Sequence, residues 1–176
     1  MRRLIFMAVA WTACAHARAN LDEMPAQVEA RYGAGTEVAA RAEYLARDRN
    51  FKRAINVREF SHEGYKIFVT FDTGRSVSET FARLDGKPLG ENEIAAFLKQ
   101  NDFGQKWQEQ QVDASAALQV IQKTTDAKTR DALRDSMVMR QWKLGDSLCA
   151  TYYGGGTLVV ETSASHVFRK GPIITL

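Results

Sequence analysis

The stretch INVREFSHEGYKIFVTFDTGRSVSETF, residues 55–81, decides the fold. It contains three runs in which apolar residues alternate with polar ones, separated by short polar turns, at 55–60, 65–71 and 75–81. The turn before Arg75 predicts a three-residue hairpin with a bulge, because Gly74 supplies the positive φ that this turn requires. The stretch therefore predicts a three-stranded antiparallel meander.

A second region repeats this pattern, and helical periodicity precedes each of the two regions. The second set of strands is predicted at 138–142, 147–153 and 157–162, and the tail 166–176 is expected to add an edge strand. Helices are predicted at 21–50 in two stretches, the first ending at Gly33–Gly35 and the second covering 37–49, and further helices at 91–100 and 114–136. We therefore expect an α+β fold whose antiparallel sheet is covered by helices on one face.

An internal repeat follows from sliding the chain by 82 residues. Six identities then align without a gap, where average composition would give about one or two: Arg58 with Arg140, Gly74 with Gly156, Val77 with Val159, Glu79 with Glu161, Thr80 with Thr162, and Ala82 with Ala164. The alternative is that any two hairpins of similar period look alike at the best offset. With residues 1–19 set aside as a signal peptide, the repeat predicts a first helix-plus-meander unit with a short helix at 20–101, a linker at 102–113, and a second unit at 114–176.

The predicted turns also set a strand register. If Phe60 pairs with Tyr65 and Phe71 with Arg75, one row of the sheet reads Arg58–Ile67–Glu79, and the repeat gives the row Arg140–Cys149–Glu161. We therefore expect an ion pair between Arg58 and Glu79 and another between Arg140 and Glu161, each reaching over one residue. The opposite face of the first unit would be open to solvent, with these residues: Lys66, Thr70, Ser76, Ser78 and Thr80.

The N-terminus has the order of a secretory signal peptide. A basic start is followed by an uncharged apolar run at 4–15 and a small-x-small site at 17–19. The alternative of a transmembrane anchor requires about 20 apolar residues, and this run is shorter. Removing Arg2, Arg3 and Arg18 leaves 24 − 3 = 21 Lys and Arg against 21 Asp and Glu. The mature chain is then neutral, which argues against nucleic acid as a partner. The signal peptide itself predicts that the protein lies in the periplasm or outside the cell.

Which cysteines remain in the mature chain depends on the cleavage site. Cys14 lies in the signal, so Cys149 would be alone in the mature chain and no intramolecular disulfide can form. Cleavage after 13–15 is an alternative. A further alternative is that Trp11–Cys14 is a degenerate lipobox, in which case Cys14 would be lipidated and the protein would contact a membrane.

The candidate chemical groups favour structural roles. Cys149 with His166 and Asp146 could form a thiol catalytic set, but Cys149 falls in the middle of a predicted core row, where a free cysteine acts as a small apolar residue. His62–Glu63 is too few ligands for a metal, and Gly154–Gly156 joins strand to strand without the helix N-terminus of a phosphate loop. A local basic cluster could contact an anionic surface: Arg41, Arg47, Arg49, Lys52 and Arg53. We expect no catalytic, cofactor-binding or metal-binding residues.

Two segments resemble a known family. MPAQVEARYG at 24–33 and YKIFVTFDTG at 65–74 are similar to small bacterial envelope domains of the SmpA/OmlA outer-membrane-assembly type, in which a helix containing Gln-Val precedes strands that end in a Phe-Asp turn. That family shares its architecture with the β-lactamase-inhibitor-protein fold. The resemblance implies tandem helix-plus-sheet units and a role in envelope assembly, and it carries no partner-binding residue over to this chain.

Two functions remain open at this level. The first is a non-catalytic module that binds another envelope or secreted protein. The second is a small periplasmic hydrolase whose site side chains come together only in the fold. A cleft holding a carboxylate or histidine of strongly perturbed pKa would favour the hydrolase.

The signal sequence generates the first prediction. The exported protein is expected to begin at Asn20 and to be about 2 kDa lighter than the translated chain, because signal peptidase removes residues 1–19. Mass spectrometry of the envelope fraction measures this directly. An uncleaved chain in that fraction would contradict the prediction, and a lipidated start at Cys14 would establish the lipoprotein alternative.

Overall fold

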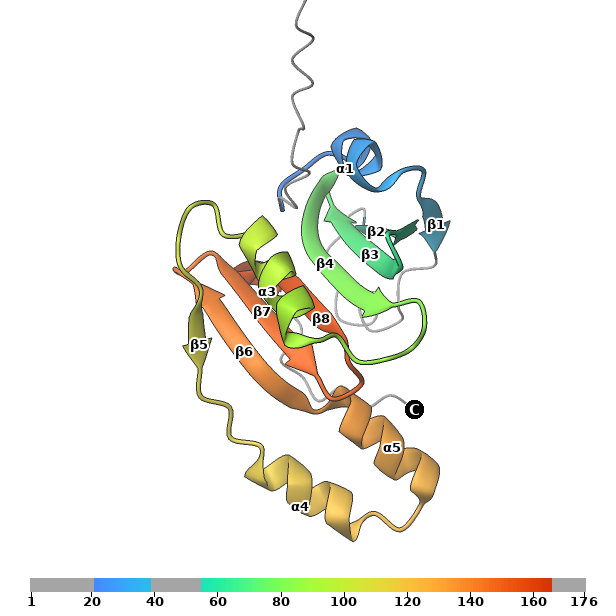
Figure 1. Cartoon of the computed structure of the whole chain (residues 1–176), viewed down its shortest axis with the longest axis vertical. Coiled ribbons are helices and arrows are strands. Elements are labelled where there is room, and N and C mark those ends of the chain that lie inside the picture. The colour runs from blue at the N-terminus through green and yellow to red at the C-terminus, as the bar shows by residue number, and fades with distance from the viewer. Residues whose placement is uncertain (1–20, 39–54, 166–176) are drawn as a thin grey trace, which may run out of the picture.

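The computed structural model describes residues 21–38 and 55–165. Figure 1 shows the helices and strands along the chain, with these bounds: α1 Pro25–Tyr32, β1 Thr36–Val38, β2 Ile55–His62, β3 Tyr65–Asp72, β4 Arg75–Arg83, α3 Glu91–Gln100, β5 Gln108–Gln110, α4 Ser115–Lys123, α5 Ala127–Ser136, β6 Val138–Leu144, β7 Leu148–Tyr153 and β8 Leu158–Thr162. The expected α+β class is confirmed.

The eight strands within the described residues belong to one antiparallel sheet. Their order is β1-β2-β3-β4-β8-β7-β6-β5. Both predicted meanders are present, as β2–β4 and β6–β8. They join where β4 pairs with β8, from Ser78 opposite Glu161 to Phe81 opposite Leu158.

The two edge strands fall where the sequence predicts other structure. β1 lies at the start of the stretch predicted as a second helix, and β5 lies inside the predicted linker 102–113. Each has three residues, and Gln108–Gln110 is entirely polar, so no apolar alternation marks it as a strand. The rest of the predicted helix, at 39–54, and the predicted tail strand at 166–176 lie outside the described residues.

The helices agree in part with their predictions. α3 has the predicted bounds, whereas α1 is shorter and ends before Gly33. The helix predicted at 114–136 is two helices, because Asp126 caps a new one. Its carboxylate accepts a hydrogen bond from the Thr129 amide at 2.7 Å, and such a cap stabilises a helix start.

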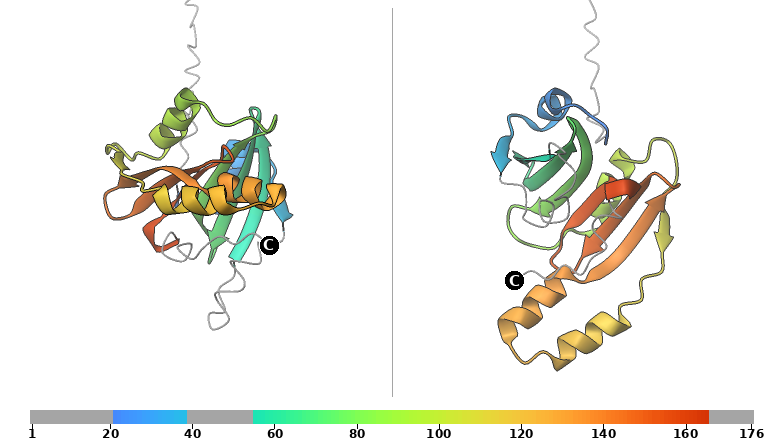
Figure 2. Two further views of the ribbon diagram at one scale, coloured as in Figure 1. Left: turned by 90° about the horizontal axis from the view of Figure 1, so that it is seen from below. Right: turned by 180° about the vertical axis from the view of Figure 1, so that it is seen from behind.

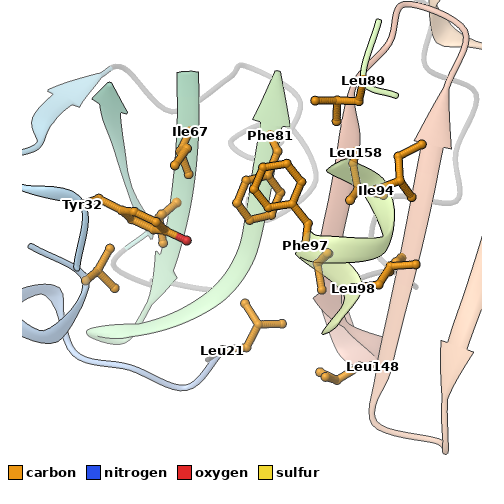
Figure 3. Packing of buried hydrophobic residues seen from close by; sticks show 14 of the residues in the cluster. Leu21, Tyr32, Ile67, Phe81, Leu89, Ile94, Phe97, Leu98, Leu148 and Leu158 are labelled. Atoms are coloured by element: carbon orange, nitrogen blue, oxygen red, sulfur yellow. The ribbon is translucent and has the colours of Figure 1, made fainter. Parts of the chain in front are cut away.

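The hydrophobic core joins sheet side chains with side chains of α1 and α3. Phe97 of α3 stacks on Phe81 of β4, with ring centroids 4.1 Å apart, and meets Tyr65 of β3 edge-on at 5.0 Å. Figure 3 shows this packing, with Phe97 and Phe81 between the two halves of the sheet. α3 therefore contacts the first meander as well as the strands that follow it.

The predicted register of the first meander is wrong by two residues at the first turn and by one at the second, and the bulge beyond the second turn adds one more. His62 pairs with Tyr65, and Asp72 pairs with Arg75, so each turn has two central residues. In the second turn these are Thr73 and Gly74, with φ of 51° and 81°, as in a type I′ turn. The bulge falls at Thr70–Phe71 instead. The sequence prediction failed because it assigned positive φ to Gly74 alone.

The face predicted to be open to solvent is buried in its centre. One row runs across five strands and contains buried side chains throughout: Val57, Thr70, Ser78, Glu161 and Cys149. Ser76 is also buried, while Lys66 and Thr80 are half-buried. The expectation for Thr70, Ser76 and Ser78 is therefore wrong.

This row generates a prediction for Cys149. Its side chain is 3% exposed, and its Sγ lies 3.9 Å from the carbonyl oxygen of Glu161. In the native state Cys149 should react with thiol reagents far more slowly than after unfolding. Cys149→Ala should lower the free energy of unfolding by about 1 kcal/mol, because it leaves a small cavity. Labelling of the native protein as fast as of the unfolded chain would contradict the burial.

Candidate functional site

Four ionisable side chains meet between α1 and the sheet. Glu79 comes from the middle of β4, Arg31 and Tyr32 from the last turn of α1, and Glu23 from the segment before α1. Arg31 Nη2 lies 2.6 Å from Glu79 Oε1 and 2.8 Å from Glu23 Oε2. The Tyr32 hydroxyl donates to Glu79 Oε2 at 3.3 Å. We call these four residues the carboxylate cluster.

The chain before α1 fixes the cluster in place. The amide of Asp22 donates to the Ser76 carbonyl at 2.7 Å, and the amide of Ser76 donates to the Glu23 carbonyl at 2.8 Å. The Glu23 amide donates to Ser76 Oγ at 2.9 Å. Pro25 then starts α1 with a φ suited to the first helical turn. The segment 22–24 is thus tied to β4 three residues from Glu79.

Burial dominates the electrostatics of the cluster. It raises the pKa of Glu79 to about 7, an effect that Arg31 opposes and the nearby charge of Glu23 adds to. Burial also raises the pKa of Glu23 against the effect of Arg31. The pKa of Tyr32 is raised by burial and by the charge of Glu79. The cluster can therefore bind or release a proton near neutral pH.

Proton exchange at Glu79 does not by itself make an active site. The Glu79 side chain is 0% exposed, and it lines neither of the two surface hollows described below. A general acid or base has to reach the reacting group within hydrogen-bond distance. In this arrangement Glu79 holds α1 against the sheet through Arg31 and Tyr32.

The predicted pairing of Arg58 with Glu79 is wrong. Both lie in one row of the same face, with Val69 between them in place of the predicted Ile67. Arg58 instead forms an ion pair with Glu29 of α1, while Glu79 binds Arg31 of the same helix. Residues two strands apart are about 10 Å from each other, and a helix packed on the row offers closer partners.

The predicted pairing of Arg140 with Glu161 is also wrong. Arg140 shares its face with Trp142, whereas Glu161 lies opposite Cys149 on the other face. Arg140 Nη1 lies 2.6 Å from Glu91 Oε2 of α3, and its Nε lies 2.7 Å from Glu109 Oε1 of β5. The shift of 82 residues thus keeps Arg58 and Arg140 on one face but separates Glu79 from Glu161.

The other candidate groups do not converge in the described residues. Cys149 is buried, while Asp146 is exposed in the turn before β7, and His166 lies outside the described residues. His62 Nε2 lies 3.9 Å from Glu63 Oε1. Within 21–38 and 55–165, no group of three or more His, Cys, Asp and Glu side chains is placed to hold a metal ion. The basic cluster at 41–53 and Cys14 lie outside these ranges.

The glycine-rich turn anchors a helical hairpin. Gly154 donates its amide to the Met137 carbonyl at 2.9 Å, and Gly155 donates to the Asp135 carbonyl at 3.0 Å. A Cβ at Gly154 would lie 2.1 Å from the carbonyl oxygen of Arg134, so only glycine allows this approach. The turn that joins β7 to β8 thus packs against the end of α5.

α4 and α5 project beyond the ends of the sheet strands (Figures 1 and 2). Ile121 is the buried side chain of α4, while Leu118 is 44% and Val120 55% exposed. A groove of about 400 Å³ runs along the hairpin, with this lining: Val112, Asp113, Ala114, Ala117, Val120, Ile121, Leu133, Ser136, Met137 and Val138. We call this surface the hairpin groove. A second hollow of about 320 Å³ lies near β1, lined by Ala34, Thr36, Val38, Glu59 and Ser61.

Sequence reasoning missed both features, for different reasons. The helical spacing of Ala117, Leu118, Ile121 and Leu133 is that of a core-facing helix, and the structure leaves Ala117 and Leu118 exposed. Helical spacing of apolar residues looks the same whether the surface meets the protein's own core or a partner. For the carboxylate cluster, the available signal was Glu79 between Val77 and Phe81 at alternate positions of its strand, and it was assigned to the wrong arginine.

Comparison of the chain with protein-family models, curated proteins and solved structures finds no match in any of the three. No helix within 21–38 and 55–165 is long and apolar enough to cross a membrane. The functional argument therefore rests on the geometry of these residues.

The carboxylate cluster generates a stability prediction. Arg31→Met leaves two carboxylates beside each other without their cation, and should lower the free energy of unfolding at pH 7.5 by about 3 to 5 kcal/mol. Arg58→Met is the matched control, because the Arg58–Glu29 pair is partly exposed and should cost less than about 1 kcal/mol. Urea denaturation measures both. Equal losses of unfolding free energy in the two variants would contradict the prediction, because the buried cluster would then stabilise the fold no more than the partly exposed Arg58–Glu29 pair.

Proposed function

We propose that this chain is a non-catalytic, exported protein-binding module that acts in the periplasm or outside the cell. Its binding surface is the hairpin groove, and its partner is another envelope or secreted protein. The observation that carries the proposal is that α4 presents Leu118 and Val120 to solvent beside an apolar groove. The signal sequence at 1–19 supports export.

The hairpin is too small to be stable without further contacts. α4 has 9 residues and α5 has 10, and isolated helices shorter than about 12 to 15 residues are marginal in water. At 100° per residue, the apolar arc of α4 from Val120 through Ile121 to Leu118 covers about 160°. Ile121 inside that arc is buried, and both flanks are exposed. A partner helix on one flank would complete the packing.

The chemistry of the surface indicates an apolar occupant. No charged residue occurs between Ser115 and Gln122, and Asp113 is the charged member of the groove lining. Met137 adds an adaptable side chain to the groove. We therefore expect the apolar face of an amphipathic helix to bind here, as in other helix-in-groove complexes. A neutral mature chain provides no overall positive potential that would attract nucleic acid.

We further propose that the sheet consists of two tandem units covered on one face by helices. The strand order is symmetric about β4–β8, with a short edge strand at each end. Glu29 of α1 pairs with Arg58, and Glu91 of α3 pairs with Arg140, 82 residues further on. On this proposal the second unit begins with α3, ahead of the predicted boundary at 114, and α4–α5 is an insertion. Such units are what the resemblance to SmpA/OmlA-type envelope domains implies.

The alternative, a small periplasmic hydrolase, has one observation in its favour. The pKa of Glu79 near 7 suits general acid–base catalysis. Its full burial weighs against this role, because a substrate would have to displace α1 to reach it. The binding module is therefore the better supported function.

The binding proposal predicts the effect of a double substitution. Leu118→Gln with Val120→Gln should weaken capture of the partner from an envelope extract by about tenfold to a hundredfold, since each exposed apolar contact contributes about 1 kcal/mol or more. Capture on immobilised mature protein, with mass-spectrometric identification and titration of the captured protein, measures this. Both positions are exposed, so the fold should be retained.

The matched control is Gln119→Ala with Gln122→Ala, which changes exposed polar residues of the same helix. It should leave capture unchanged. If both double variants capture the same proteins as the wild type, the hairpin groove is not the binding surface. If the captured protein is a second copy of this chain, the partner assignment is wrong although the surface is right.

A further inference from the structure

We propose that the carboxylate cluster makes the attachment of α1 to the sheet depend on pH, so that α1 is held more tightly in mildly acidic solution than in mildly alkaline solution. This inference is independent of the hairpin groove and of any partner. It concerns a local opening of α1 and the segment 22–24 while the rest of the sheet stays folded.

The charge count of the cluster is the first step. Arg31 contributes one positive charge, and Glu23 and Glu79 contribute two carboxylates to the same Nη2. The Arg31 side chain is 5% exposed and the Glu79 side chain 0%. A buried excess negative charge is unfavourable, and one proton on the pair removes it. The docked state therefore gains stability from binding one proton.

Among residues 21–38 and 55–165, the elements around Glu79 do not add a second positive charge at hydrogen-bond distance to it. From β2, Arg58 is engaged by Glu29 of α1, and the His62 ring packs against the Tyr32 ring at 5.6 Å. β3 and β8 place Val69 and Val160 beside Glu79. From the segment before α1, Asp22 faces Arg75 at 4.0 Å.

The direction of the pH effect follows from linkage. The pKa of Glu79 is about 7 when α1 is docked, against 4.5 for a glutamate in water. A raised pKa means that the docked state holds the proton more tightly, so its stabilisation is complete below about pH 4.5 and is lost as pH rises through 7. Between pH 5.5 and 8, the docking equilibrium should weaken on the order of thirtyfold.

Release of α1 would uncover an apolar part of the sheet. Val28 and Tyr32 of α1 are 0% and 7% exposed, and the Tyr32 ring lies 5.7 Å from the Phe60 ring of β2. Phe60 is 1% exposed in the docked state. The proton on the cluster thus controls access to this apolar face.

Hydrogen exchange on the full mature chain tests the proposal. Protection factors of the α1 amides, corrected for the intrinsic pH dependence of exchange, should fall on the order of thirtyfold from pH 5.5 to pH 8. Amides of β7 should keep their protection over the same range. An equal fall in α1 and β7 would show global destabilisation and overturn a local device, as would constant α1 protection.

Variants assign the effect to the cluster. Glu79→Gln should make α1 protection independent of pH, whereas Glu29→Gln, the matched control on the same helix, should keep the wild-type dependence. If Glu79→Gln fails to fold, Glu23→Gln replaces it and should move the transition to lower pH, because it removes the charge that raises the pKa of Glu79. A wild-type pH profile in Glu79→Gln, or an unmoved transition in Glu23→Gln, would overturn the proposal.

Discussion

Backbone hydrogen bonding between β4 and β8 joins two meanders into one sheet, and the other tertiary features depend on it. β4 is a central strand of this sheet, and it has buried side chains on both faces, including Glu79 on one and Ser78 on the other. α3 packs near this seam, with Phe97 against Phe81 of β4, and the Tyr152 hydroxyl of β7 donates to the Leu89 carbonyl before α3. The core is consequently shared by both meanders.

A charged residue in the centre of such a sheet needs a partner from another layer. Strand neighbours of Glu79 in its row are Val69 and Val160, so the sheet itself offers no cation beside it. α1 supplies Arg31, and the segment before α1 supplies Glu23. The cluster therefore links the attachment of the helix to the protonation of Glu79 in the sheet. Buried ionic groups of this kind are costly unless paired, which makes them sensitive to pH.

The hairpin of α4 and α5 shows the reverse situation. The sheet buries a charged residue, whereas α4 exposes apolar residues that do not pack in the core. It is attached through the end of α5, where Gly154 and Gly155 hydrogen-bond to its last residues. The rest of the hairpin extends past the sheet (Figure 2). Apolar surface that the protein's own core leaves exposed is what a binding surface requires.

The sequence by itself determined the strands of both meanders and the bounds of α3, because alternation and helical spacing are local properties of the chain. It also identified Arg58, Glu79 and Arg140 as charges that needed partners. Only the tertiary structure decided which partners they found, because Glu29, Arg31 and Glu91 reach them from packed helices that no strand register describes. The same limit applies to Leu118: its spacing fits a core helix, and its exposure depends on where the hairpin stands relative to the sheet.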